Sequence, residues 1–188
     1  MVRLQRLTGA LPGEVCGLKP AYIDRSGNVW MAILTEHKTK HHGKTRTIYI
    51  GPKAQSVLLP YLLRDENDFC FKPSDSERKR RTTQSANRVT PMSCGNRPGT
   101  NVKAAPAMQP GDQYDVSAFR RAIHRACVKA NVQCWHPNQL RHSAATEIRK
   151  QFGLDSAASI LGHSDVGVTQ VYAENDRTKA LAVALKIG

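Results

Sequence analysis

Acidic residues are scarce in this chain. Its 188 residues include 15 Asp and Glu against 28 Lys and Arg, which gives a formal net charge of +13. Such an excess of positive charge attracts polyanions over long range, so we expect nucleic acid as the partner. An anionic membrane surface is the alternative, but the sequence has no polybasic amphipathic helix and no acylation motif to support it.

Long apolar runs are also missing. The first twenty residues have no apolar core of signal-peptide length, and no run approaches the roughly 18 apolar residues of a membrane span. The five cysteines lie far apart and form no Cys-x-x-Cys pair, so they indicate neither a disulfide framework nor a zinc site. We therefore expect reduced thiols, no metal and no membrane, in a cytoplasmic, nucleoid-associated protein.

The first part of the chain predicts a small sheet beside short helices. Residues 29–34 (VWMAIL) and 45–50 (TRTIYI) are apolar, β-branched or aromatic runs separated by a polar loop, a pattern typical of an antiparallel pair of strands. A short helix is expected around Val15. Residues 52–64 repeat apolar positions at three- and four-residue steps, which predicts a helix with one buried face.

The second part of the chain predicts helices only. Asp115 is a suitable N-cap for the first of them, and Gly153 and Gly162 are suitable C-terminal caps for the next two. The first helix is expected to bury the apolar residues spaced along one of its faces: Val116, Phe119, Ile123, Cys127 and Ala130. No internal repeat is visible. We expect one compact α+β domain, mainly helical, with a small antiparallel sheet at one edge. The predicted helices cover residues 116–130, 138–152, 156–161, 166–172 and 178–186.

Residues 72–111 differ from their surroundings. They carry eight Lys or Arg against Asp75 and Glu77, five prolines and little periodic hydrophobicity. We expect a basic, mobile insertion here. It is either an arm that folds onto DNA phosphates or a solvated run of charge with no specific role.

Residues 140–172 place an arginine, two histidines and a tyrosine at fixed intervals. A tyrosine phenol, with a pKa of about 10, is a poor nucleophile and needs help. A phosphodiester under attack gathers negative charge on its oxygens, which Arg141 and His163 would stabilise, the arginine through two parallel hydrogen bonds. Lys38, in a polar loop, would protonate the leaving 5' oxygen. Tyr172 would be the nucleophile.

This set resembles the tyrosine recombinase, or phage integrase, family. In that family Leu-Arg-His-x-x-Ala-Thr, then Leu-Gly-His, then Thr-x-x-Tyr recur in this order and at these spacings, and "TG..PGEV", "HKT" and "RTIYI" extend the resemblance upstream. It covers nearly all of residues 1–188 apart from 72–111. The motifs stand here as Leu140-Arg141-His142 with Ala145-Thr146, Leu161-Gly162-His163, and Thr169-Gln170-Val171-Tyr172.

The resemblance implies a catalytic domain that cleaves and rejoins DNA. Tyr172 would form a 3'-phosphotyrosine link and release a 5' hydroxyl that later attacks in reverse, so neither ATP nor a metal is needed. Lys38 would match the lysine that protonates the leaving oxygen. Arg141 and His163 would hold the same phosphate. Strand exchange in this family implies a homo-tetramer on two DNA duplexes.

Three further positions would support the site. Glu14 matches the acidic residue that orders it, and His142 is the neighbour of Arg141, with a supporting role rather than direct contact. Asn138 stands where the family most often has a histidine. Its amide can donate a hydrogen bond to phosphate but cannot exchange a proton at neutral pH. His136, two residues earlier, should point elsewhere.

Leu11 is the more serious departure, because it occupies the position of the family's first catalytic arginine. A leucine donates no hydrogen bond and holds no charge, and loss of such an arginine costs on the order of 10³ to 10⁵ in rate. Arg3 and Arg6 lie in the same segment and are the candidates to replace it.

Two main functions follow from these residues. The first is a recombinase that acts through Tyr172, and the second is a catalytically impaired, DNA-binding relic of a mobile-element integrase, which Leu11 favours. A topoisomerase-like relaxing enzyme is a third. The N-terminal DNA-binding domain usual in this family is expected to be absent. His37, His41 and His42 make a poor zinc site, so we expect them to face phosphate or solvent.

Overall fold

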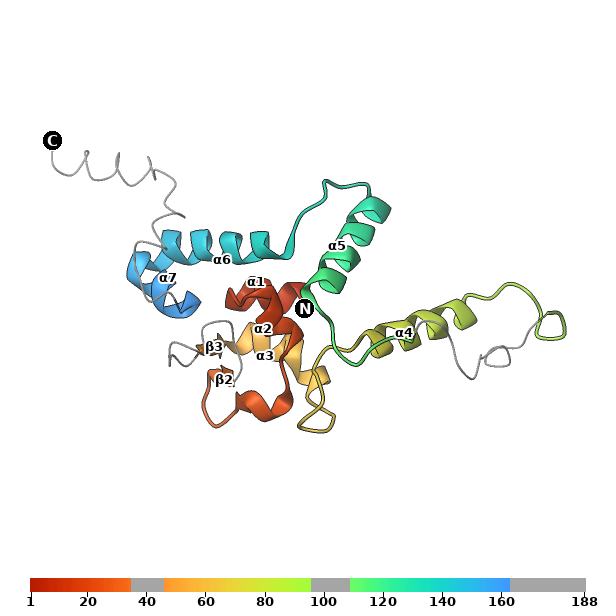
Figure 1. Ribbon diagram of the computed structural model, residues 1–188, viewed down its shortest axis with the longest axis horizontal. Coiled ribbons are helices and arrows are strands. Elements are labelled where there is room, and N and C mark those ends of the chain that lie inside the picture. Colours follow the sequence, from red (N-terminus) through yellow and green to blue (C-terminus); the bar gives the residue numbers. More distant parts are fainter. Residues whose placement is uncertain (35–45, 96–108, 163–188) are drawn as a thin grey trace.

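The computed structural model describes residues 1–34, 46–95 and 109–162. It confirms a mainly helical α+β fold with a small antiparallel sheet at one edge (Figure 1). The predicted helices over residues 166–172 and 178–186 lie outside the described residues. The helices are α1 (Val2–Thr8), α2 (Pro12–Cys16), α3 (Pro52–Leu58), α4 (Pro73–Ala86), α5 (Val116–Ala130), α6 (Pro137–Phe152) and α7 (Leu154–Leu161), with 3-10 turns η1 (Pro20–Tyr22) and η3 (Leu59–Tyr61).

The sheet has the order β1-β2-β3 and is antiparallel throughout. Its strands are β1 (Ile23–Asp24), β2 (Trp30–Leu34) and β3 (Arg46–Ile50). The predicted pair β2–β3 is confirmed, with Ala32 opposite Ile48. Successive strand side chains point to opposite faces, so Ile48 is buried while Tyr49 is exposed.

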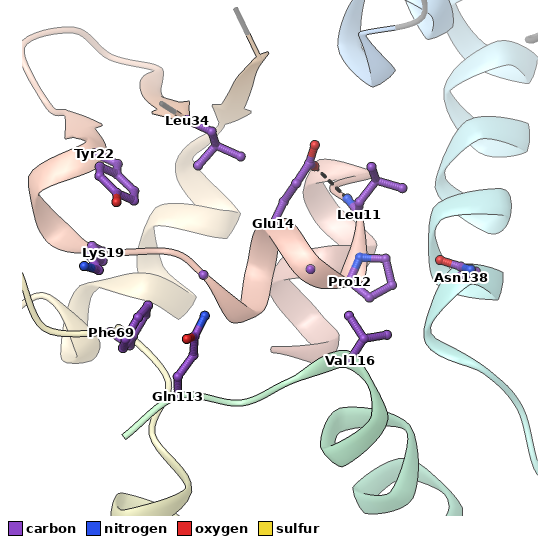
Figure 2. A pocket seen from close by; sticks show the side chains of 12 residues that line it. Leu11, Pro12, Glu14, Lys19, Tyr22, Leu34, Phe69, Gln113, Val116 and Asn138 are labelled. Atoms are coloured by element: carbon purple, nitrogen blue, oxygen red, sulfur yellow. Dashed lines mark hydrogen bonds between the residues drawn. The ribbon is translucent and has the colours of Figure 1, made fainter. Parts of the chain in front are cut away.

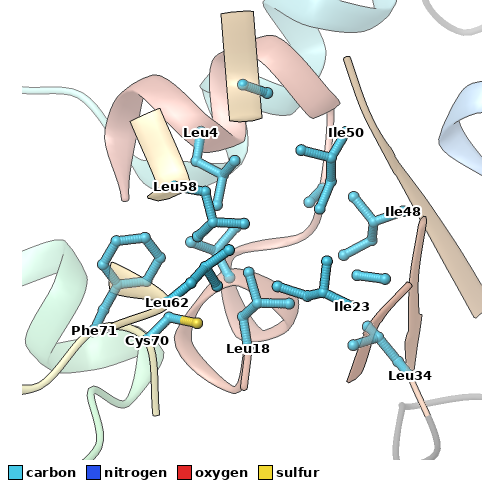
Figure 3. Close-up of a cluster of buried hydrophobic side chains, with 14 residues drawn as sticks. Leu4, Leu18, Ile23, Leu34, Ile48, Ile50, Leu58, Leu62, Cys70 and Phe71 are labelled. Carbon is cyan, nitrogen blue, oxygen red and sulfur yellow. The ribbon is translucent and has the colours of Figure 1, made fainter. Parts of the chain in front are cut away.

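The main core forms where the sheet meets α1 and α3. Leu58 is fully buried and Leu18 is 2% exposed, and Figure 3 shows them gathered with Leu4 and Ile50 around one centre. A smaller apolar cluster joins α2 to α5 through Cys16, Phe119, Ile123 and Cys127.

Two buried cysteines are packing residues in this structure. Burial raises the pKa of the Cys16 thiol to about 11 and that of the Cys70 thiol to about 12. Both thiols are therefore protonated at neutral pH, and neither behaves as a reactive thiolate.

The predicted helix over residues 52–64 is shorter than expected. The α-helix α3 ends at Leu58 and the chain continues as the 3-10 turn η3. Pro60 explains the change, because proline has no backbone N–H to donate to the carbonyl four residues earlier.

The helix that follows Asp115 is confirmed. The Asp115 side chain accepts a hydrogen bond from the backbone N–H of Ala118, and α5 buries Phe119 and Ile123 as its apolar spacing predicted. Val116 and Ala130 were also expected on the buried face and are instead exposed. These two residues are the first and last of α5, so only the middle of the helix packs against the body.

The next two helices are also confirmed. α6 buries Ala144 and Ala145, whereas Leu140 and Ile148 are only half-buried. α7 begins two residues earlier than predicted and ends at Gly162, which has the left-handed φ of 68° expected of a C-terminal cap. Gly153 also has a positive φ, 89°, but its ψ of 177° lies outside the left-handed helical region, so the left-handed cap expected there is wrong.

Residues 72–111 contain a helix that the apolar pattern did not indicate. α4 has no buried residue and extends away from the body (Figure 1). Ion pairs along its own surface stabilise it instead, from Asp75 to Arg78 and from Glu77 to Arg80 and Arg81. Hydrogen bonds from Arg80 and Arg81 lower the pKa of Glu77 to about 2, so this cluster stays ionised at neutral pH.

Gly9 gives a test of the packing between α1 and α7. It has a φ of 65°, and an added Cβ would lie 2.7 Å from Cδ2 of Leu161. We expect Gly9→Ala to lower the free energy of unfolding by roughly 2–4 kcal/mol, because the left-handed backbone and the overpacking both cost free energy. Urea unfolding followed by tryptophan fluorescence measures the change. The control is Gly111→Ala, whose Cβ would make only ordinary contacts; equal losses in both variants would contradict this account.

Candidate functional site

Arg141 is a buried cation at the junction of three segments. Its side chain comes from α6 and the residue is 8% exposed. Nη1 donates a hydrogen bond to the carbonyl of Gly9 at 2.6 Å, and Nη2 donates to the carbonyl of Leu161 at 2.9 Å. The Leu161 carbonyl lies in the last turn of α7, where helix carbonyls lack partners within the helix. Arg141 therefore ties α6 to the loop after α1 and to the end of α7.

Glu14 and Arg46 form a second buried charged group beside the first. Nε of Arg46 donates to Oε1 of Glu14 at 2.9 Å, and the two side chains are 10% and 7% exposed. The backbone N–H of Leu11 donates to Oε2 of the same carboxylate at 2.7 Å. The Arg46 guanidinium also reaches the carbonyl of Ile160, 3.4 Å from Nη1. Glu14 therefore connects the start of α2 to β3 and, through Arg46, to α7.

Arg46 was not predicted from the sequence as a site residue. One signal could have found it: in "RTIYI" the residues in phase with Ile48 and Ile50 face the core, and Arg46 is in that phase. A charged residue at an inward strand position needs a buried partner, and such partners are uncommon away from functional or structural centres.

A groove of about 630 Å³ lies beside these charged groups. Three of the predicted site positions line it: Leu11 and Glu14 on the α2 side and Asn138 on α6, which faces them (Figure 2). Leu11 is 37% exposed. Lys19 is the one cation among the described residues that line the groove, and its Nζ lies over the Phe69 ring, 4.7 Å from the ring centroid.

Arg3 and Arg6, the two residues predicted to substitute for an arginine at position 11, do not line this groove. Arg6 forms an ion pair with Glu147 on the surface of α6. Arg3 is exposed and lines a separate hollow between α1 and α5. The structure therefore shows no guanidinium group at the position of Leu11 among the described residues.

Two histidines close to Arg141 in the sequence, His136 and His142, are exposed. His142 lies on α6 directly after Arg141, and His136 precedes the first turn of α6, where its backbone N–H donates to Gln139. His136 does not line the groove, whereas Asn138 does. This placement agrees with the expectation that His136 points elsewhere.

Three predicted catalytic residues, Lys38, His163 and Tyr172, lie outside the described residues. The same is true of His37, His41 and His42. Within residues 1–34, 46–95 and 109–162 no three His, Cys, Asp or Glu side chains gather as a metal site would require. The helices of these ranges are also too short or too polar to cross a membrane.

The exposed face of α5 carries four cations. α5 starts at Val116, which lines the groove (Figure 2). In the described part of the chain, Arg120, Arg121, Arg125 and Lys129 form no hydrogen bond or ion pair. By contrast, Arg78, Arg80 and Arg81 of α4 are paired with carboxylates. Of these two helices, α5 is therefore the one whose positive charge is not neutralised locally.

Comparisons with known proteins agree with this fold. The family model described as "Phage integrase family" matches residues 1–179. Tyrosine recombinase XerC of Stutzerimonas stutzeri (strain A1501) is 35% identical over 69 residues, which are 36% of this chain and 23% of XerC.

Solved recombinases share the fold at lower identity. The crystal structure of XerA recombinase has a TM-score of 0.60 and 21% identity, and the match covers 99% of this chain and 56% of XerA. The Tn1549 transposon integrase in complex with transposon right end DNA has a TM-score of 0.60 and 16% identity, over 99% of this chain and 57% of that one. The chain thus spans little more than half the length of these two structures. Because the family model matches all but the last residues, the chain belongs to the phage integrase family of tyrosine recombinases.

Proposed function

We propose that this chain is the catalytic domain of a site-specific DNA recombinase that acts through Tyr172. The observation that supports it most is the placement of Arg141, which is buried and bonded to the carbonyls of Gly9 and Leu161. This arrangement fixes the Leu-Arg-His helix against the end of α7, immediately before His163 in the sequence. A phosphate clamp needs such a rigid setting, because a displacement of about 1 Å can cost ~10²-fold in rate.

The reaction would be an exchange of one phosphodiester for another. The Tyr172 phenol oxygen would attack phosphorus, and the bond from phosphorus to the 5' oxygen would break, leaving a 3'-phosphotyrosine link. Lys38 would give a proton to the departing 5' oxygen. Arg141 and His163 would stabilise the charge on the phosphate oxygens. Attack by a 5' hydroxyl on the link would reverse the step and release Tyr172, so no metal or nucleotide cofactor takes part.

Double-stranded DNA is the proposed substrate. The net charge of +13 and the unpaired cations of α5 support it, because neutralising phosphates releases counterions. The Tn1549 integrase was solved in complex with transposon right end DNA, and XerH was solved bound to a difH substrate. We extend DNA binding to this chain on that basis, and with it a homo-tetramer on two duplexes, a mobile-element origin, and a cytoplasmic, nucleoid-associated location.

A specific observation favours the second candidate, an impaired DNA-binding relic. Leu11 lies in the groove where an arginine would stand, and Arg3 and Arg6 lie elsewhere. A phosphate in this groove would meet a leucine side chain in place of a charged hydrogen-bond donor. Fold and DNA binding would survive that change, whereas turnover would fall.

Covalent trapping distinguishes the two candidates. We expect Leu11→Arg to raise the yield of denaturant-resistant protein–DNA adduct on nicked suicide duplexes by on the order of 10³-fold, because it restores a transition-state cation. The duplexes come from the sequences that flank the gene. The control Tyr172→Phe should form no adduct, and an adduct that persists there would reject Tyr172 as the nucleophile. DNA binding without an adduct, from both the unaltered chain and Leu11→Arg, would favour the relic or a need for the N-terminal domain usual in this family.

Salt dependence of DNA affinity tests the role of α5. We expect the double variant Arg121→Gln and Arg125→Gln to reduce the slope of log affinity against log salt by about 1.8, since each phosphate contact adds about 0.9. Fluorescence anisotropy with a labelled duplex gives the slope. The matched control, Arg80→Gln with Arg81→Gln, removes equal charge from α4, where Glu77 already neutralises it. A larger loss of slope in this control would place the DNA on α4 instead.

A further inference from the structure

We propose that Arg46 is a positioning residue of the cleavage site, which acts through Glu14 and the end of α7 without touching DNA. The inference rests on the proposed function, since the site that Arg46 positions is the one assigned to DNA cleavage. It assigns a role to the first residue of "RTIYI", for which the resemblance names no function.

Arg46 fixes the segment that contains Leu11. Its Nε and Nη2 lie 2.9 Å and 3.4 Å from the two oxygens of Glu14, and one of those oxygens also accepts the Leu11 N–H. The Glu14 carboxylate thus has three donors from two segments. Removing either partner of such a buried pair destabilises the fold strongly, because the remaining charge would stay buried without compensation.

Arg46 also fixes the end of α7. Its Nη1 lies 3.4 Å from the carbonyl of Ile160, and Nη2 of Arg141 takes the next carbonyl, that of Leu161. Two guanidinium groups, one from β3 and one from α6, therefore hold consecutive carbonyls at the negative end of the helix dipole. The Leu-Gly-His motif begins at this point, so the backbone that leads to His163 starts from a position set by both arginines.

Gly162 shows how closely Arg46 approaches this end of α7. A Cβ on Gly162 would lie 2.3 Å from Nη1 of Arg46, well inside any permitted contact, and its φ is 68°. The glycine of the motif is therefore required for two reasons, the left-handed backbone and the adjacent guanidinium.

Arg46 differs from Arg141 in that a carboxylate, Glu14, already occupies its guanidinium, so it has no charge to offer a phosphate in this arrangement. The residue is 9% exposed, and its guanidinium is bonded to Glu14 and Ile160. Its contribution to catalysis would be geometric: loss of the planar fork would let the Leu11 segment and the α7 end shift relative to Arg141. A shift of this kind affects the chemical step more than the affinity for DNA.

Single-turnover cleavage at saturating DNA tests the proposal in whichever form of the chain gives an adduct, unaltered or Leu11→Arg. We expect Arg46→Lys, which keeps the charge but not the fork, to slow adduct formation by ~10²-fold while the dissociation constant for DNA stays within about twofold. Arg6→Lys is the matched control, because it alters an exposed ion pair with Glu147. A thermal midpoint lowered by Arg46→Lys with an unchanged cleavage rate would overturn the proposal. So would a loss of DNA affinity with a shallower salt slope, which would make Arg46 a phosphate contact.

Amide hydrogen exchange tests the same positioning without any chemistry. The Gly162 N–H donates to the carbonyl of Ser159 in the last turn of α7. We expect its exchange to be about tenfold faster in Arg46→Lys, while the amides in the middle of α6 keep their rates. Unchanged exchange at Gly162 would overturn the positioning role. If no form of the chain gives an adduct, the proposed function fails, and exchange at Gly162 still decides whether Arg46 holds the α7 end.

Discussion

Two buried guanidinium groups meet at the C-terminal end of α7, and the arrangement of the other segments depends on them. Arg141 brings α6 and the Gly9 loop to this point, and Arg46 brings β3 and, through Glu14, the start of α2. Buried cations require partners on every side, so elements far apart in the sequence have to converge here. Gly9 and Gly162 permit that convergence, because a side chain at either position would overlap Leu161 or Arg46.

The charged junction of Arg141, Arg46 and Glu14 is distinct from the apolar core of the domain. The apolar core gathers around Leu58 and includes none of the charged groups. Leu11 is partly exposed. The hydrogen bond from its backbone N–H to Glu14 fixes its position, and its side chain does not. A substitution at Leu11 therefore leaves both the core and the charged junction intact. The fold therefore does not depend on which side chain stands at position 11.

Much of this fold follows from periodicity. The alternation in "RTIYI" and the apolar steps along α5 predicted a strand and a helix that the structure confirms. α4 escaped prediction because its stability comes from ion pairs along its own surface, and these leave no apolar period. Arg46 was missed although its phase with Ile48 and Ile50 indicates an inward position, because the sequence does not show that Glu14 is its partner. The assignments of Lys38, His163 and Tyr172 rest on the resemblance alone and stay predictions.

The way α4 is attached has a consequence for how this protein can vary. A hydrogen bond from Ser74 to the carbonyl of Gly111 brings the two ends of the excursion together at its base, and Tyr114 donates to Ser76 beside it. The described residues between them, 75–95 and 109–110, contribute nothing to the core, and the entropy of closing such a loop grows only with the logarithm of its length. Evolution can therefore lengthen, shorten or exchange this excursion at little cost to the rest of the domain.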